Sequence, residues 1–301
     1  MDFLIGLWNG ASSDDTPPTI GNPTTSINGN LLRIQLPVTD SSGVYKAFLT
    51  YTAVNNQATT GTWQSIEKAG TCTSGQQISS LDVPLPSTGE VDYFIQVMDC
   101  AGNVSVKMDN GQYYKVYTVS SLAAQDGWIL ESSETSNKGG MLNSTATACN
   151  IGDDAANKQY LCILHFDTSG LPDNAVITSV TLKIMKQGLV GTNPFTTHGP
   201  LLVDVRKPFF GATAGLALND FGAAAGKPAA ATFSATPANN WYSAVFGNPA
   251  YPFINLTGTT QFRLRFTKDD NNDHGADYMS FFSGNVAAAS RPTLVIEYYV
   301  P

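Results

Sequence analysis

The chain has 301 residues, of which 42% are hydrophobic, so it can bury one large core or two ordinary ones. Charged residues make up only 13%, while Gly, Pro, Ser, Thr and Asn are frequent, which is typical of short strands joined by tight turns. A net charge of −8 without a Lys/Arg cluster argues against a nucleic-acid or anionic-membrane partner, and no apolar stretch is long enough for membrane insertion.

Residues 1–15 form an apolar segment followed by a polar linker. The apolar run is shorter than the hydrophobic region of a signal peptide and lacks a basic start. An extended apolar strand of this kind can add to the open sheet edge of a neighbouring chain. If the chain self-assembles, the candidate side chains are therefore Phe3, Leu4, Ile5, Leu7 and Trp8.

Residues 16–119 carry the pattern of a first domain. Apolar and polar residues alternate along 32–38, and 40–43 form a turn before the next alternating run. One face of the first of these strands consists of Leu32, Ile34, Leu36 and Val38. About seven strands in roughly a hundred residues, with turn signals between them, predict a β-sandwich.

The end of this domain has a recognisable motif. The segment 93–103 reads Tyr-Phe-Ile-Gln-Val-Met-Asp-Cys-Ala-Gly-Asn. Together with the turn at 40–44, it resembles the strand end of bacterial fibronectin-III/Ig-like modules, and the resemblance covers about residues 16–119. It implies a fibronectin-III/Ig-like sandwich that acts as a spacer or adhesion unit.

A linker at 120–125 precedes a second predicted domain at 126–301. Its clearest strands lie at 161–166, 175–184 and 293–298, and in another, Arg263 and Arg265 alternate with the apolar residues Phe262, Leu264 and Phe266. In the first of these strands, His165 points away from Cys162 and Leu164, which favours an exposed or edge position.

These blocks together resemble the bacterial DNRLRE-type domain over about residues 124–301. That domain is related to a carbohydrate-binding module family known for alginate-like polysaccharides. The resemblance implies a larger, jelly-roll-like sandwich without catalytic activity. The chain departs from the family at 157–162, where Asn-Lys-Gln-Tyr-Leu-Cys replaces an Arg-bearing run.

The four cysteines fall two and two into the predicted domains, and no CxxC pair occurs. We predict the disulfides Cys72–Cys100 and Cys149–Cys162, the second across a hairpin. The alternatives are that one pair forms, or that all four are buried thiols. Two disulfides imply export to an oxidising compartment.

The most polar stretch, 268–277, lies between two predicted strands. Calcium prefers several oxygen ligands from one flexible loop. The candidate ligands are Asp269, Asp270, Asn272, Asp273 and Asp277. The alternative is a solvated loop built from turn-forming residues. Calcium is the only cofactor that the sequence suggests.

Candidate ligand-binding residues are aromatic rings able to stack on a sugar, and one histidine in a loop. They are Trp241, Tyr242, Tyr251 and His198. Core positions for the rings and a turn role for the histidine are the alternatives. The stretch 211–238 reads as a short helical turn or a long loop over a sheet face, and such stretches are often functional.

No nucleophile elbow, HExxH helix or phosphate loop occurs, so we predict that the chain is not an enzyme. The favoured function is that of an extracellular, bacterial-type secreted protein that binds polysaccharide or a cell-surface glycan through its second domain. One alternative is a structural subunit of a surface layer or filament, whose partners are copies of itself. A second is an accessory part of a secreted polysaccharide-degrading enzyme.

Overall fold

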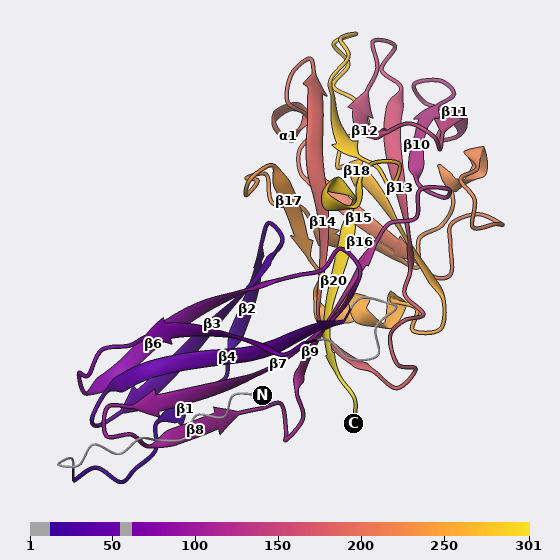
Figure 1. Cartoon of the computed structure of the whole chain (residues 1–301). Coiled ribbons are helices and arrows are strands. Elements are labelled where there is room, and N and C mark those ends of the chain that lie inside the picture. Colours follow the sequence, from indigo (N-terminus) through magenta and orange to yellow (C-terminus); the bar gives the residue numbers. More distant parts are fainter. Residues whose placement is uncertain (1–12, 55–61) are drawn as a thin grey trace. The chain divides into compact units, whose positions relative to one another are not determined.

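The computed structural model describes residues 13–54 and 62–301 (Figure 1). The chain divides into two compact units, Met1–Tyr117 (unit 1) and Thr118–Pro301 (unit 2). Nearly all regular structure is antiparallel strand, so the predicted all-β class with β-sandwich architecture is confirmed. In the described part of the chain, no helix has the length and apolar character needed to cross a membrane. Outside the described residues lie Phe3, Leu4, Ile5, Leu7 and Trp8.

Unit 1 is built from two antiparallel sheets. The first sheet contains β1 (Thr19–Ile20), β2 (Thr24–Asn28), β3 (Leu31–Asp40) and β6 (Gly75–Pro84). The second contains β4 (Val44–Val54), β5 (Gln64–Ala69), β7 (Gly89–Asp99), β8 (Val104–Lys107) and β9 (Tyr114–Ser120).

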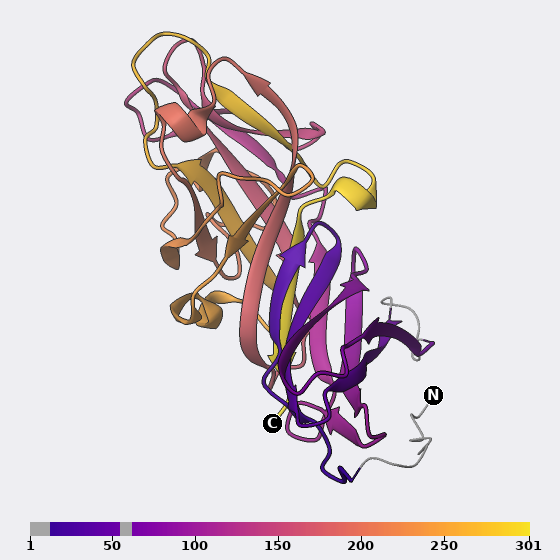
Figure 2. The ribbon, with the colours of Figure 1, turned by 90° about the vertical axis from the view of Figure 1, so that its left-hand side faces the viewer.

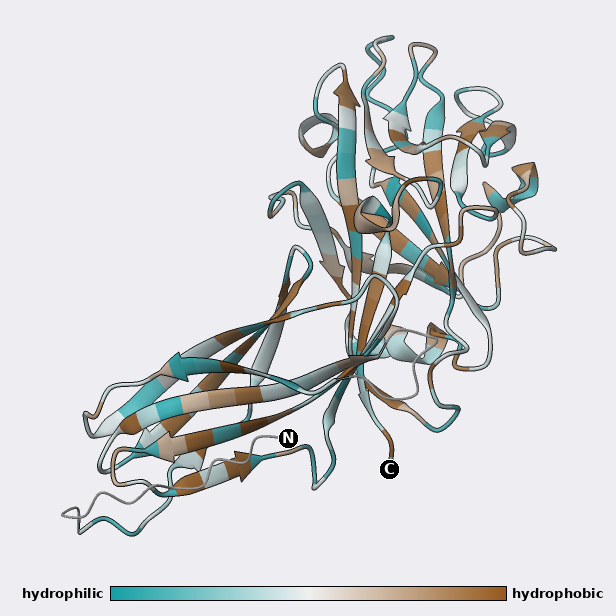
Figure 3. Ribbon diagram, in the orientation of Figure 1, coloured by the Kyte–Doolittle hydropathy of each residue, from teal (hydrophilic) through white to brown (hydrophobic). Residues whose placement is uncertain are grey.

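The core of unit 1 follows from the two-residue period of its strands. Along β3, the apolar face predicted from the sequence is fully buried, and the residues between are more exposed. In the second sheet, Leu49 of β4 and Ile95 of β7 pair with each other and are fully buried as well. Figure 3 shows the resulting alternation of hydrophobic and hydrophilic residues along the strands.

The predicted Cys72–Cys100 disulfide is present, with its Cα atoms 5.6 Å apart. It joins the loop before β6 to the end of β7. The turn between β3 and β4 packs against the same loop, because a Cβ on Gly43 would lie 2.4 Å from the Thr73 nitrogen. Gly43 also has a φ of +84°, so this close approach requires glycine.

Unit 2 also has two layers of strands (Figures 1 and 2). Sheet I contains β16 (Lys227–Thr232), β15 (Leu201–Arg206), β18 (Thr259–Phe266), β13 (Gln159–Asp167), β10 (Gly127–Glu131) and β11 (Gly139–Asn143). Sheet II contains β12 (Ala148–Asp153), β19 (Tyr278–Phe282), β14 (Val176–Val190), β17 (Trp241–Val245) and β20 (Thr293–Tyr299).

Helical structure in unit 2 is confined to short pieces between strands. They are the α-helix α1 (Pro194–Thr197) and the 3₁₀ turns η1 (Leu218–Asp220), η2 (Asn248–Phe253) and η3 (Ala288–Ser290). The side chain of Asn193 caps α1 by accepting the Phe195 amide, and Pro194 occupies its first position. Most of their residues are exposed or half-buried, and Pro194, Asp220 and Ala250 are buried.

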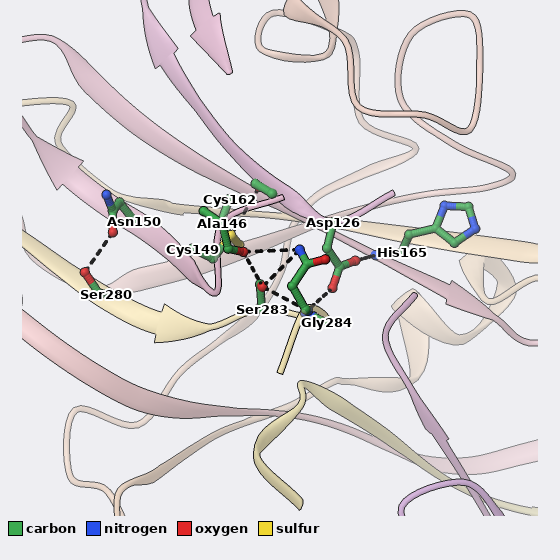
Figure 4. Close-up of a disulfide and its surroundings, with 11 residues drawn as sticks. Asp126, Ala146, Cys149, Asn150, Cys162, His165, Ser280, Ser283 and Gly284 are labelled. Atoms are coloured by element: carbon green, nitrogen blue, oxygen red, sulfur yellow. Dashed lines mark hydrogen bonds between the residues drawn. A yellow bond between two sulfur atoms is a disulfide. The ribbon is translucent and has the colours of Figure 1, made fainter. Parts of the chain in front are cut away.

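The Cys149–Cys162 disulfide connects the two sheets of unit 2 (Figure 4). β12 and β13 pair only at Gly152↔Tyr160 and Asp153↔Gln159, beside their hairpin turn. Beyond that point β12 pairs with β19, whereas β13 pairs with β18 and β10. The predicted bond is therefore present, but it joins diverging strands and not opposed positions of one ladder.

Next to this disulfide, the buried carboxylate of Asp126 ties two segments together (Figure 4). Its Oδ1 accepts the His165 amide at 2.7 Å, and its Oδ2 accepts the Gly284 amide at 3.0 Å. Complete burial raises the pKa of Asp126 to about 7, although these hydrogen bonds lower it. Asp126 is therefore protonated in the folded chain at pH values where it is ionised in the unfolded chain.

We predict that replacing Cys149 and Cys162 by alanine destabilises unit 2 by about 3 kcal/mol, because the bond closes a short loop in the unfolded chain. This corresponds to a fall in its unfolding midpoint of roughly 6 to 12 °C. Hydrogen exchange along a temperature ramp reports on peptides of each unit separately. The matched control replaces Cys72 and Cys100, and equal loss of protection in both units from either double variant would contradict the assignment.

The raised pKa of Asp126 makes the stability of the fold depend on pH. A carboxyl group whose pKa is raised on folding stabilises the folded state at low pH, and this contribution disappears as pH rises through the folded pKa. The stability of the wild type relative to an Asp126→Asn variant should therefore fall between pH 4 and pH 7. Denaturant unfolding of both proteins across this range checks the sign. A difference that grows with pH would refute it.

Candidate functional site

Sheet I of unit 2 is covered on both faces. Phe262 and Leu264 of β18 lie on its inner face, in the core between the sheets, and Arg263 and Arg265 lie on its outer face as the alternation predicts. A small second core covers the outer face under residues 207–226. It consists of Ile129, Leu161, Ile163, Phe210 and Phe221.

Arg263 holds this covering loop in place. Its Nη1 donates to three backbone carbonyl oxygens of the loop, at 2.8 to 3.2 Å, those of Asp220, Phe221 and Ala223. The guanidinium carbon also lies 4.8 Å from the centre of the Phe210 ring. These contacts bury Arg263 and assign it a structural role.

The two arginines share one buried carboxylate. Asp204 Oδ2 accepts Arg263 Nη2 at 2.8 Å and Arg265 Nε at 3.1 Å, and its Oδ1 accepts the Ala229 amide at 2.9 Å. Burial alone would raise the pKa of Asp204, but hydrogen bonds from Arg265, Ala229 and Arg263 bring it below its ordinary value. Asp204 is therefore ionised and compensates one of two positive charges.

Beside the covering loop, the outer face opens into a groove of about 380 Å³. We call it the Arg265 groove, because the side chain of Arg265 is 28% exposed while Arg263 is buried. The other polar side chains that line it are Asn137, Gln159, Thr267 and Asp269. The apolar residues that line it, Leu161, Phe221 and Phe266, are at most 5% exposed.

The buried carboxylate of Glu131 fixes two walls of the Arg265 groove. Its Oε1 accepts the backbone amide of Asn137 at 2.6 Å, and its Oε2 accepts that of Gln159 at 3.4 Å. The side-chain amides of Asn137 and Gln159 make no hydrogen bond to any residue in the ranges 13–54 and 62–301. Both amides therefore keep a donor and an acceptor for a ligand.

Two of the aromatic rings predicted to bind a ligand are core residues, which corrects that expectation. Trp241 is 7% exposed and has the Lys183 ammonium 4.6 Å from its ring centre. Tyr242 is 4% exposed and stacks on Phe195 at 5.5 Å. Neither ring presents a face to a sugar. The predicted contact residue His198 is fully buried as well, so the interpretation as a ligand-contacting loop histidine is wrong.

Tyr251 remains a candidate at a separate place in unit 2. Its ring is half-buried, and its hydroxyl donates to the Thr178 carbonyl at 3.0 Å. It lines a groove of about 560 Å³ together with Val176, Pro252 and Leu256. This groove is more apolar than the Arg265 groove.

Three half-exposed aromatic rings form a row on neighbouring strands of unit 2. Trp128 of β10 meets Tyr160 of β13 at 5.3 Å, and Tyr160 meets Tyr278 of β19 at 5.3 Å. None of the three was selected from the sequence as a ligand-binding residue. The row could not be predicted from the sequence, because its three residues come from strands that are far apart in the chain.

The predicted calcium loop satisfies its carboxylates largely with its own donors. Asp273 accepts the Gly275 amide at 2.6 Å, and Asp270 Oδ1 accepts the Asn272 amide at 3.0 Å. Asp277 accepts the Thr192 amide and the Asn271 side chain. Within the described residues, no three of the loop's carboxylates lie within 4.8 Å of one another. Calcium binding by Asp269, Asp270, Asn272, Asp273 and Asp277 stays a prediction.

One group of three acidic side chains in the described part of the chain has carboxylate oxygens within 4.8 Å of one another. It lies in unit 1 and consists of Asp14, Asp40 and Asp99. Asp99 accepts the amides of Ala101 and Asn103, and Asp40 accepts the amide and hydroxyl of Ser42. These donors account for the orientation of both carboxylates, so we assign no ion to the group.

Comparison with known proteins adds little. No protein-family model matches the chain, and no curated protein matches it. Among solved structures, the C-terminal domain of the Streptococcus pyogenes antigen I/II-family protein AspA is similar over 95% of this chain and 91% of that chain. The sequence identity is 10% and the TM-score is 0.23. A score this low supports no statement about the fold or function of this chain.

The different roles of the two arginines can be tested. We predict that Arg263→Met destabilises unit 2 by about 3 kcal/mol, because it removes one partner of a buried ion pair and three carbonyl contacts. Arg265→Met should cost under about 1 kcal/mol, since Arg265 is partly exposed. Denaturant unfolding measures both values. Equal losses would contradict the division into a structural arginine and a groove arginine.

Proposed function

We propose that the chain is a non-catalytic extracellular protein that binds polysaccharide in the Arg265 groove of unit 2. The observation that supports this proposal is the set of planar polar side chains in one open groove, those of Arg265, Asn137 and Gln159. Sugars present neighbouring hydroxyl groups, which such side chains bind in pairs.

The walls of the groove support binding without rearrangement. Glu131 fixes the backbone at Asn137 and Gln159, and Asp204 holds the guanidinium of Arg265. A binding site whose groups are already oriented loses less entropy when a ligand binds. The fixed walls therefore favour a flexible ligand such as a polysaccharide, because the ligand alone loses conformational freedom on binding.

The charges in the groove determine which glycans it suits. Arg263 and Arg265 both bind the carboxylate of Asp204, and Asp269 also lines the groove, so the groove has mixed charge and no excess of positive charge. The proposal therefore includes neutral glycans beside uronate-containing ones, with Arg265 as the residue that pairs with a uronate carboxylate.

The two disulfides are compatible with an extracellular location. Within the proposal, unit 2 belongs to the DNRLRE-type carbohydrate-binding domains, and unit 1 is a fibronectin-III/Ig-like spacer that carries unit 2 at a cell surface.

A glycan array with the full chain tests the proposal, with and without calcium, and calorimetry then measures the affinity for the best ligand. We predict that Arg265→Ala weakens this affinity about tenfold or more, because a hydrogen bond from a charged group is lost. The double variant Asn137→Ala/Gln159→Ala should weaken it similarly.

The matched control is Arg33→Ala in unit 1. Arg33 is also partly exposed and also bound to a carboxylate, that of Asp82. It should leave the affinity unchanged. Absence of binding to every glycan would refute the function, whereas a loss confined to Tyr160→Ala would move the site to the row of Trp128, Tyr160 and Tyr278.

A further inference from the structure

Strand β6 of unit 1 has a partner strand on one side only. It is ten residues long and pairs with β3 at the end of the first sheet, and it pairs with no other strand in the described parts of the chain (Figure 1). Its pairing with β3 runs without a bulge from Leu31↔Pro84 to Asp40↔Gly75. The other side of β6 is therefore a long and regular open edge.

The hydrogen-bond pattern of an antiparallel ladder identifies the free backbone groups of this edge. The Leu85 amide donates to the Asn30 carbonyl at 2.9 Å, directly beyond the last pair between β3 and β6. Because every second pair of such a ladder is hydrogen-bonded, the backbone groups of the odd-numbered β6 residues face β3. Those of the even-numbered residues face away from β3, and within the described residues they make no hydrogen bond. The outward residues with a free N–H and C=O are Gln76, Ile78, Ser80 and Asp82.

The other open edges of the chain are protected. Open edges are usually short, bulged or charged, because they otherwise pair with other chains. The remaining strands that end a sheet in the described residues have at most six residues. Of these, β5 of unit 1 carries Glu67 and Lys68, and the pairings of β11 and β16 in unit 2 each contain a register shift. The edge of β6 has neither a bulge nor a short length to protect it.

Charge does not protect β6 either. Asp82 is its single charged residue, and both oxygens of this carboxylate accept hydrogen bonds from Arg33 of β3 at 2.8 Å. The strand contains no lysine, and its proline, Pro84, is the last residue. The edge from Gln76 to Asp82 is therefore uninterrupted, and its one charge is compensated within the unit.

We propose that β6 pairs antiparallel with β6 of a second copy of the chain, so that the first sheets of two units 1 form one continuous sheet. A second copy fits this edge because its own β6 offers the same length of free backbone. A two-fold axis perpendicular to the sheet then makes the two edges complementary to each other. This interface lies in unit 1 and does not depend on glycan binding by the Arg265 groove.

The free backbone groups favour a register with the two-fold axis at Ser79. Gln76 then lies opposite Asp82 of the second copy, and Ile78 lies opposite Ser80 of the second copy. In this register each outward N–H and C=O group of these residues has a partner. The Gln76 amide can also donate to the Asp82 carboxylate of the other copy, and no like charges are opposed.

The dimer should be weak. In the monomer the outward groups bond to water, so each hydrogen bond between the copies contributes little net free energy. The net charge of −8 on each copy adds a repulsion that salt reduces. We expect a dissociation constant on the order of 10 to 100 μM at physiological salt, as for a transient contact.

Sedimentation velocity of the full chain across roughly 5 to 500 μM tests the proposal, since this range spans the expected dissociation constant. Hydrogen–deuterium exchange at the two ends of this range locates the interface. We expect a monomer–dimer equilibrium, and slower exchange at high concentration in the peptide that contains β6. The peptide that contains β5 should exchange equally at both concentrations.

Two variants of the exposed residue Ser80 disrupt the edge. Ser80→Lys places two positive charges diagonally across the proposed interface, and Ser80→Pro removes an outward N–H group while keeping the bonds to β3. Each should raise the dissociation constant about tenfold or more. The matched control is Ala69→Lys, which adds the same charge to the exposed edge strand β5 and should leave the dissociation constant unchanged.

A wild type that stays monomeric over the whole range would overturn the proposal. Unchanged dimerisation in folded Ser80→Lys and Ser80→Pro variants would overturn it as well. If the dimer is lost only in an Ile5→Lys variant, self-assembly belongs to the apolar N-terminal segment. If neither Ser80 variant folds, the exchange of the wild type decides, and slower exchange in β5 instead of β6 would exclude the assigned edge.

Discussion

Arg263 and Asp204 form the interaction on which the outer face of unit 2 depends. A sheet that is covered on both sides needs polar partners for the backbone of the covering loop, since a loop has no ladder to satisfy its carbonyl groups. The Nη1 group of Arg263 donates to three carbonyl oxygens of that loop, and the carboxylate of Asp204 compensates the charge of the buried guanidinium. The pair thus gives the loop a fixed position, and the Arg265 groove is the part of the face that the loop leaves open.

The sequence predicted what depends on local periodicity. The strand faces of Leu32 and Leu36, the opposition of Arg263 to Phe262, and the distribution of cysteines follow from a period of two and from spacing. His165 lies on the face that alternation assigns to it. It is nevertheless buried, because the covering loop lies over this face. The side-chain nitrogen of Gln261 is 3.1 Å from His165 Nδ1 and donates to the Ala214 carbonyl of that loop.

Contacts between distant segments could not be predicted in this way. Asp204 lies 59 residues from Arg263, and Asp153 lies 45 residues from His198. Exposure also depends on what covers a face, so Trp241 was expected at a binding surface although it is buried. The acidic run at 268–277 has the residue types of a cation site. Whether its carboxylates come close enough to share a cation depends on the loop conformation, which composition does not predict.

In the proposed function, the ligand contacts the outer face of sheet I. Hydrogen–deuterium exchange of the full chain, with and without a bound oligosaccharide, tests this directly. Increased protection is predicted in peptides that contain Asn137, Gln159 and Arg265, with peptides of unit 1 unchanged. Protection confined to peptides around Tyr251 or Tyr278, or none in unit 2, would contradict the account.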